Sequence, residues 1–235
     1  MAVRSVELFD PAVVARIRAR RAGRFHLTRA LDGAGTALVV VDMQLAFTGA
    51  GAPSGTGEAT SVIPAINAVA RALRAAGGRV AFSRATFDGS EHGGWPGFYG
   101  RMVAPDLAGR ILGALREGAP EHALDPGLEV APEDFVFPKN RYSAFAPGAS
   151  SLPEWLAGRA VRTVLVAGTI TNVCCESTAR DAMQHGYDTV MLADACAARD
   201  RGAHLAALTT FAEFFGDVLT AAEAVDALAG DAPGE

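Results

Sequence analysis

The chain has 235 residues, half of them hydrophobic, and a net charge of −5 at pH 7, which suits one α/β domain or two small ones. It has no basic run interleaved with aromatics, no apolar run of the ~18 residues that a membrane span needs, and no signal-peptide core. Neither nucleic acid nor a membrane is therefore an expected partner. Its cysteines, Cys174, Cys175 and Cys196, are too few and too clustered for a disulfide framework, so we expect a cytoplasmic protein.

Apolar runs alternate with segments of helical periodicity along the chain. The pattern predicts strands at residues 37–41, 79–83, 135–137, 162–168, 189–192 and 217–219. It predicts helices at residues 11–21, 62–76, 172–185, 202–215 and 220–228. Continuous apolar strands such as the first are typical of strands buried on both faces. The repeated β-then-α order predicts a three-layer α/β/α fold, with a parallel sheet between two layers of helices.

Three segments depart from this rhythm. Residues 1–32 form an N-terminal extension, residues 33–228 a single domain, and residues 229–235 a disordered tail. Within the domain, residues 84–134 separate two adjacent strands. A connection of about 50 residues in a compact domain is usually functional. We therefore interpret this insertion as a lid or pocket wall.

Lys139 is the only lysine of a chain that has 21 basic residues, the others being arginine. Either residue can serve as a solvated surface charge, so the exception can be a chance survivor. It can also mark a position where a guanidinium does not serve. Arginine is a planar fork that stays charged, whereas lysine is a compact ammonium whose pKa shifts when it is buried.

Polar residues stand where the expected strands end, and ligands of open parallel sheets bind beyond those carboxyl ends. Asp42 closes the first strand, Lys139 follows the third, and Cys174 lies in the first turn of the helix after the fourth. An acid that ends an apolar strand is unfavourable unless it is paired, so an Asp42–Lys139 ion pair is expected. A helix N-terminus lowers the pKa of a thiol, which favours a nucleophilic Cys174. A cysteine that only packs in the core is the alternative.

A family resemblance rests on segments 40–44 (VVDMQ), 138–145 (PKNRYSAF) and 168–182 (GTITNVCCESTARDA). In wording, order and spacing they resemble the isochorismatase-like cysteine hydrolases, and the resemblance covers about residues 36–228. It implies a six-stranded parallel sheet of order 3-2-1-4-5-6. It also implies a catalytic triad of Asp42, Lys139 and Cys174.

The same resemblance implies a cis peptide between Thr169 and Ile170, with the backbone N–H groups of Ile170 and Cys174 forming an oxyanion hole. Asp42 would accept the thiol proton, and the thiolate would attack an amide-like carbonyl. A thioester would remain after an amine or ammonia leaves, and water would hydrolyse it. Lys139 would orient Asp42. The third strand lies at the sheet edge in this order, so the placement of Lys139 beside Asp42 rests on the resemblance alone.

The neighbouring thiols are assigned to the core. Cys175 lies ~100° around a helix from Cys174, so the two cannot face one carbonyl. The motif register selects Cys174 as the nucleophile. Cys175 and Cys196 are expected to pack under or against the sheet.

The motifs look most like those of ureidoacrylate and N-carbamoyl-type amidohydrolases, so the resemblance implies a small amide or ureido substrate and a homo-oligomer. The candidate substrate-binding residues are Gln44, Tyr142, Phe145 and Asn172, with Trp95 and Phe98, or Tyr99, from the insertion. Ordinary loop packing is an equally good interpretation of those insertion aromatics.

Other readings remain open. Isochorismate-cleaving relatives usually lack the cysteine, so its presence favours C–N hydrolysis over vinyl-ether cleavage. Asp88 and His92 only faintly resemble a nicotinamidase metal site, so no metal or cofactor is expected. The glycines of residues 49–57 follow a strand but lack dinucleotide-binding spacing, which argues against an oxidoreductase. A non-enzymatic binding protein would be expected to have lost the triad.

Overall fold

The computed structural model describes residues 3–233, in which six strands form one sheet of order β3-β2-β1-β4-β5-β6. All neighbouring strands pair in parallel. The strands are β1 (Thr36–Val41), β2 (Arg79–Ala85), β3 (Phe135–Lys139), β4 (Thr163–Thr169), β5 (Asp188–Ala197) and β6 (Asp217–Leu219). The predicted fold class and strand order are therefore confirmed.

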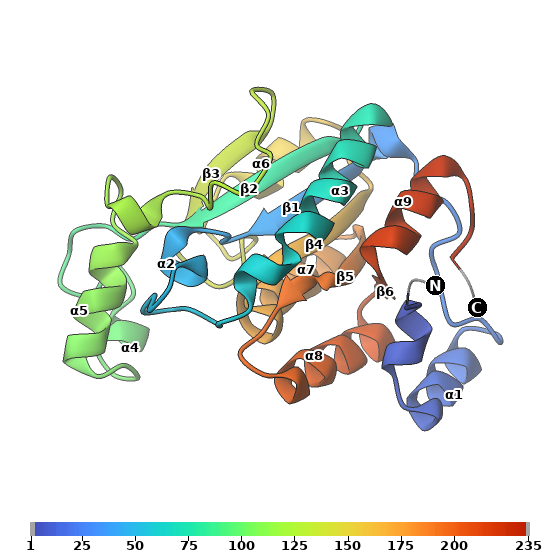
Figure 1. Ribbon diagram of the computed structural model, residues 1–235, viewed down its shortest axis with the longest axis horizontal. Coiled ribbons are helices and arrows are strands. Elements are labelled where there is room, and N and C mark those ends of the chain that lie inside the picture. Colours follow the sequence, from blue (N-terminus) through green and yellow to red (C-terminus); the bar gives the residue numbers. More distant parts are fainter. Residues whose placement is uncertain (1–2, 234–235) are drawn as a thin grey trace.

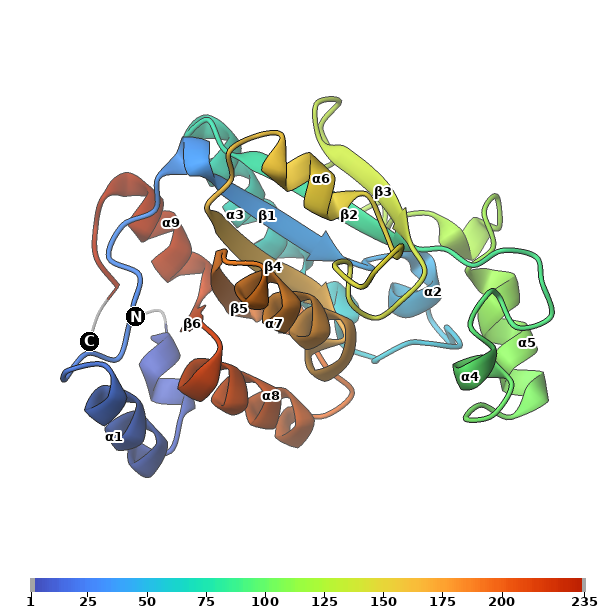
Figure 2. The same ribbon diagram turned by 180° about the vertical axis from the view of Figure 1, so that it is seen from behind.

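Helices cover both faces of the sheet. Their bounds are α1 (Pro11–Arg20), α2 (Leu45–Thr48), α3 (Ile63–Ala75), α4 (Pro96–Tyr99), α5 (Pro105–Ala114), α6 (Leu152–Ala157), α7 (Glu176–Gln184), α8 (Arg201–Phe214) and α9 (Ala221–Ala229). One face packs against α3 and α9, in front of the sheet in Figure 1. The other packs against α6, α7 and α8, in front in Figure 2. None of the helices in residues 3–233 has the length and hydropathy of a membrane span.

Alternation along β1 explains why the sheet lies between two cores. Val39 and Val41 belong to the core on the α7 side, whereas Leu38 and Val40 belong to the core on the α3 side. Every residue of β1 is buried. The continuous apolar run of β1 is therefore explained as predicted, because the strand is covered on both faces.

Some predicted boundaries are wrong. The third strand was expected to end before Pro138, yet β3 continues to Lys139. Proline has no backbone N–H to donate, but β3 is an edge strand, where proline is tolerated, and Pro138 is exposed. The fifth strand was expected to end at residue 192, but β5 continues to Ala197 past an irregular register with β4. Its small residues resemble a loop in sequence, although Cys196 and Ala197 pair with Gly168 and Thr169.

The N-terminal extension packs on the described chain itself, against α8 and the end of the sheet formed by β6 (Figures 1 and 2). Its helix α1 begins at Pro11, where the Asp10 side chain accepts a hydrogen bond from the Ala12 N–H at 2.7 Å. Ile17 and Phe25 are fully buried. At the other terminus α9 extends to Ala229, one residue into the predicted tail, whose residues 234–235 lie outside the described part.

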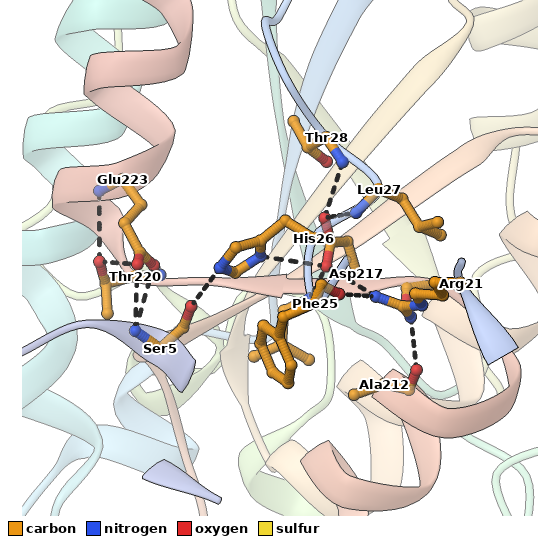
Figure 3. Close-up of polar contacts among 12 residues, drawn as sticks. Ser5, Arg21, Phe25, His26, Leu27, Thr28, Ala212, Asp217, Thr220 and Glu223 are labelled. Atoms are coloured by element: carbon orange, nitrogen blue, oxygen red, sulfur yellow. Dashed lines mark hydrogen bonds and ion pairs between the residues drawn. The ribbon is translucent and has the colours of Figure 1, made fainter. Parts of the chain in front are cut away.

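A buried polar cluster anchors this extension (Figure 3). The carboxylate of Asp217, at the start of β6, accepts hydrogen bonds from the backbone N–H groups of Leu27 and Thr28, both at 2.8 Å. Arg21 and His26 each place a nitrogen 3.3 Å from the same carboxylate. Burial would raise the pKa of Asp217, but the His26 side chain, the Thr28 N–H and Arg21 together lower it.

We expect Asp217→Asn to lower the free energy of unfolding by about 2–3 kcal/mol at pH 7. Because the folded-state pKa lies below the unfolded value of about 3.9, the carboxylate stabilises the fold at higher pH. This contribution is lost as the pH falls below that value. The difference between the variant and the wild type should therefore shrink in urea unfolding at pH 3. Asp188→Asn, at the exposed first residue of β5, is the matched control, and an equal loss there would contradict the assignment.

Candidate active site

A cavity of about 380 Å³ lies at the carboxyl ends of the strands, and Asp42, Lys139 and Cys174 all line it. The insertion supplies much of its outer wall through α4 and α5, which lie beyond the ends of β1 and β2 (Figures 1 and 2). Phe87, Tyr99 and Leu115 form a separate apolar cluster there. The predicted role as a pocket wall fits this placement, whereas movement as a lid stays a prediction.

Asp42 follows the last residue of β1 and is completely buried, with a left-handed backbone at φ +50°. Its N–H donates to Ser83 Oγ at 3.1 Å, and that hydroxyl donates to Asp42 Oδ1 at 2.7 Å. The other oxygen, Oδ2, lies 2.6 Å from Lys139 Nζ. The predicted ion pair is thus present.

The side chain of Lys139 crosses β2 to reach Asp42. Lys139 pairs in register with Ala85 of β2, and both side chains lie on the face of the sheet that carries Ala81 and Phe137. Alternate residues of β2 on this face are Ala81, Ser83 and Ala85, all small. The small side chain at 85 leaves the lysine stem a path over the strand, which explains how an edge-strand residue joins the site.

Burial removes Lys139 almost completely from water, with 2% of its surface exposed. This burial would lower the pKa of the ammonium, but the negative charge of the neighbouring Asp42 carboxylate outweighs it and the pKa is raised. Nζ also donates to the Arg141 carbonyl at 2.9 Å. Lys139 therefore remains a charged ammonium fixed between two acceptors.

Cys174 lies in a π-helical turn, Thr171–Cys175, that directly follows a cis Thr169–Ile170 peptide. The cis peptide agrees with the family resemblance. The regular helix α7 begins at Glu176 and continues this turn without a break, so Cys174 lies in the first turn of the helical segment after β4, as predicted, but that turn is π-helical. The deviation follows from a wider turn, in which the Cys175 N–H reaches the Ile170 carbonyl at 3.2 Å.

The expected lowering of the Cys174 pKa is wrong. Burial raises the pKa of this thiol to about 12, because the opposing charge of Lys139 does not compensate and Asp42 raises it further. Helix-terminal stabilisation was expected to dominate, but only 5% of the surface of Cys174 is exposed. The resting group is therefore a thiol, and a thiolate requires a nearby base.

The other cysteines are buried and lie outside the lining of this cavity. Cys175 Sγ contacts the Ala167 carbonyl at 3.8 Å, and Cys196 Sγ contacts the Val166 carbonyl at 3.6 Å.

Gly168 allows β4 to lie close to the end of β1, since a Cβ there would lie 2.2 Å from the Val41 carbonyl oxygen. Its φ of +111° also favours glycine.

The predicted substrate-binding residues divide into two groups. Tyr142, Asn172, Trp95 and Phe98 line the cavity, as does Tyr99. Trp95, Phe98 and Tyr142 also contact one another, with ring centroids 4.9 Å apart for Trp95–Tyr142 and 5.5 Å for Phe98–Tyr142. The insertion and the lysine motif therefore meet at this aromatic wall.

Gln44 and Phe145 do not line the cavity, which corrects their expected role. The Gln44 amide donates to the carbonyls of Ala85 and His122 at 3.3 and 2.9 Å, and accepts from the Ala85 N–H at 2.7 Å. Gln44 thus fixes the end of β2. Phe145 is buried and packs against the rings of His185 and Tyr187. Nearness to a catalytic residue in sequence did not place either side chain in the pocket.

Several lining residues were not predicted. Arg199 and Asp200 follow β5, and they were missed because that strand was expected to end at residue 192. With the correct end, they would have been recognised as residues at the carboxyl edge. Arg141 lies inside the lysine motif and also lines the cavity, with its guanidinium 5.1 Å from the Trp95 ring centroid. Among the described residues, no group of three or more His, Cys, Asp or Glu side chains is arranged for a metal ion.

Comparison with known proteins places this geometry in a family. Residues 36–223 match the Isochorismatase domain. The ureidoacrylate amidohydrolase RutB of Stutzerimonas stutzeri (strain A1501) is 36% identical over 203 residues, which cover 80% of each chain. RutB of Pseudomonas syringae pv. syringae (strain B728a) is 38% identical over 201 residues, covering 77% of this chain and 78% of that protein.

Solved structures of other proteins have a similar fold. A cysteine hydrolase from Pseudomonas syringae pv. phaseolicola 1448A is similar with a TM-score of 0.76 and 30% identity, covering 86% of this chain and 97% of that one. N-carbamoylsarcosine amidase from Thermoplasma acidophilum shares the fold, with a TM-score of 0.64, 24% identity and coverage of 79% and 96%. The chain belongs to the isochorismatase family, and it is a hydrolase of that family. The predicted resemblance is therefore confirmed.

Proposed function

We propose that this hydrolase is a cysteine-dependent amidohydrolase that cleaves a C–N bond of a small amide or ureido compound through a thioester. The observation that carries the proposal is the buried Asp42–Lys139 ion pair beside Cys174, in a cavity of about 380 Å³. A thiol whose pKa is raised to about 12 needs a base, and Asp42 is the carboxylate beside it.

The proposed reaction begins when Asp42 accepts the Cys174 proton and the sulfur attacks the substrate carbonyl. Backbone N–H groups of Ile170 and Cys174 hold the developing oxyanion, and the ammonium of Lys139 keeps Asp42 in place. Asp42 then protonates the leaving nitrogen, which departs as ammonia or an amine. Water adds to the thioester with Asp42 as base, releasing the acid and restoring the thiol.

The lining of the cavity favours a substrate that also carries a carboxylate. Arg141 and Arg199 both line it, and guanidinium groups match carboxylates in charge and shape. The aromatic wall of Trp95, Phe98 and Tyr142 offers flat surfaces to a planar, conjugated compound. These features agree with the substrate named for the RutB relatives. We therefore propose ureido acids as the preferred class.

Release of ammonia from a panel of ureido acids, N-carbamoyl amino acids, neutral amides and lactams tests the substrate class. We expect turnover of ureido acids to exceed that of neutral amides of equal size. Arg199→Ala should raise KM for the best acid by about 10-fold, the loss of roughly one charged hydrogen bond. Arg201→Ala, exposed and outside the lining of this cavity, should change it little. Equal turnover of neutral amides and acids would contradict the carboxylate preference.

We also expect the enzyme to work without a metal or cofactor, to form a homo-oligomer and to reside in the cytoplasm. Activity that EDTA removes and zinc restores would overturn the first of these.

A further inference from the structure

Ser83 is buried beneath the catalytic centre, with no exposed surface, and lies outside the lining of the cavity. Its hydroxyl makes two hydrogen bonds to one residue. It accepts from the Asp42 N–H at 3.1 Å and donates to Asp42 Oδ1 at 2.7 Å. The position follows from the sheet, because β2 is the neighbour of β1 and Val40 pairs with Phe82.

The contact matters because Asp42 is the first residue after β1. Its left-handed backbone, at φ +50°, turns the following chain out of the strand, and its N–H donates to the Ser83 side chain. Ser83 supplies an acceptor to that N–H and a donor to the carboxylate, which fixes the rotation of the side chain. A buried N–H and a buried carboxylate oxygen would otherwise lack partners.

The two oxygens of Asp42 therefore have different surroundings. Oδ1 accepts the hydrogen bond that the Ser83 hydroxyl donates, whereas Oδ2 lies 2.6 Å from Lys139 Nζ, an ion-pair contact outside hydrogen-bond geometry. Among the described residues, none forms a hydrogen bond with Oδ2. It is the oxygen left able to accept a proton.

We propose that Ser83 is a positioning residue that makes Asp42 Oδ2 the catalytic base. The inference rests on the cysteine mechanism proposed above. Ser83 holds Oδ1 through its donated hydrogen bond, so that Oδ2 is presented to the thiol of Cys174. The charged or titratable groups around Asp42 are Lys139 from β3, Cys174 and Cys175 from the π-turn, and Tyr99 from α4.

The first test measures the rate of Cys174 alkylation by iodoacetamide as a function of pH, with the label located by mass spectrometry. This readout needs no substrate, so it is independent of the substrate class. Asp42 accepts the thiol proton as the sulfur is alkylated, so alkylation slows where the carboxylate is not held in place. Ser83→Ala should lower the alkylation rate about 10-fold across the pH range, part of the ~10²–10⁴ that general acid–base catalysis contributes. Ser83→Thr, which keeps a hydroxyl and suits a strand, should restore the wild-type profile.

The second test is kinetic. On the best substrate, Ser83→Ala should lower kcat about 10- to 100-fold, part of the ~10²–10⁴ that general acid–base catalysis contributes. KM should change little, because Ser83 does not line the cavity. Thr189→Val is the matched control, since it removes a buried hydroxyl bonded to the Tyr187 carbonyl at the opposite end of the sheet.

These outcomes separate positioning from simple stabilisation. A Ser83→Ala variant with wild-type alkylation rates would overturn the inference, whatever its thermal stability. So would a Ser83→Thr variant as impaired as Ser83→Ala. An alkylation rate that falls as expected, in a protein that hydrolyses no amide in the panel, would support the role of Ser83 and contradict the proposed function.

Discussion

Replacement of Cys174 by alanine is expected to abolish turnover, lowering kcat by at least about 10⁴-fold, because no other group can form the acyl intermediate. The sulfur lines the cavity beside the Asp42–Lys139 pair. Since the alanine is smaller and apolar at a buried position, the fold should persist. The measurement is ammonia release under saturating substrate, with circular dichroism to confirm folding. Full activity of the variant would contradict the thioester mechanism.

Cys175→Ala is the matched control, because it removes an adjacent thiol of the same turn. Cys175 is completely buried and its sulfur contacts the Ala167 carbonyl rather than the cavity. We expect most of the activity to remain and stability to fall by about 1 kcal/mol. Mass spectrometry of substrate-treated protein should detect an acyl group on the peptide that contains residues 174 and 175 in the wild type and in Cys175→Ala. The same peptide of Cys174→Ala should carry no acyl group.

Features that depend on local pattern could be predicted from the sequence. Continuous apolar runs located β1 and β4, and the β-then-α order indicated a parallel sheet. Such a sheet gathers the residues that follow each strand at one edge, so Asp42 and Cys174 were expected close together before any contact was known. The order of the strands came from the family resemblance instead, because the periodicity of a strand does not identify its neighbours.

Features that depend on contacts distant in sequence could not be predicted. Ser83 resembles any polar residue inside a strand until β1 and β2 are placed side by side. The path of Lys139 over Ala85 likewise depends on the register of β2 and β3. The pKa of Cys174 was expected to fall because the sequence indicates a helix start, but it does not show how deeply the thiol is buried.

The boundary of β5 shows how one local error hides a functional residue. Residues 193–197 are small and include Asp194, so their pattern favours a loop. In the structure they continue the strand beside β4, and the Asp194 carboxylate accepts from the Ala221 N–H at 2.7 Å. Arg199 then follows the true end of the strand and lines the cavity. A side chain can be assigned to the catalytic edge only when the end of its strand is known.

The change Lys139→Arg is expected to lower kcat by about 10²–10³, the loss typical of one positioned electrostatic interaction. Lys139 is enclosed, with Nζ 2.6 Å from Asp42 Oδ2 and 2.9 Å from the Arg141 carbonyl. A guanidinium is wider and planar, so it cannot occupy the same point between these acceptors. The positive charge beside Asp42 is kept, and the fold should therefore persist. The measurements are kcat on the best amide and circular dichroism.

Arg162→Lys is the matched exchange at an exposed ion pair with Asp32, where the side chain of Arg162 is 66% exposed. Solvent there accommodates either cation, so wild-type kcat is expected, and a loss would implicate the exchange itself rather than the site. The stem of Lys139 crosses at Ala85, and the bulkier guanidinium must either displace Asp42 or remain short of it. Near-wild-type turnover of Lys139→Arg would show that any cation serves at this position, and that the single lysine of the chain is only a charge partner.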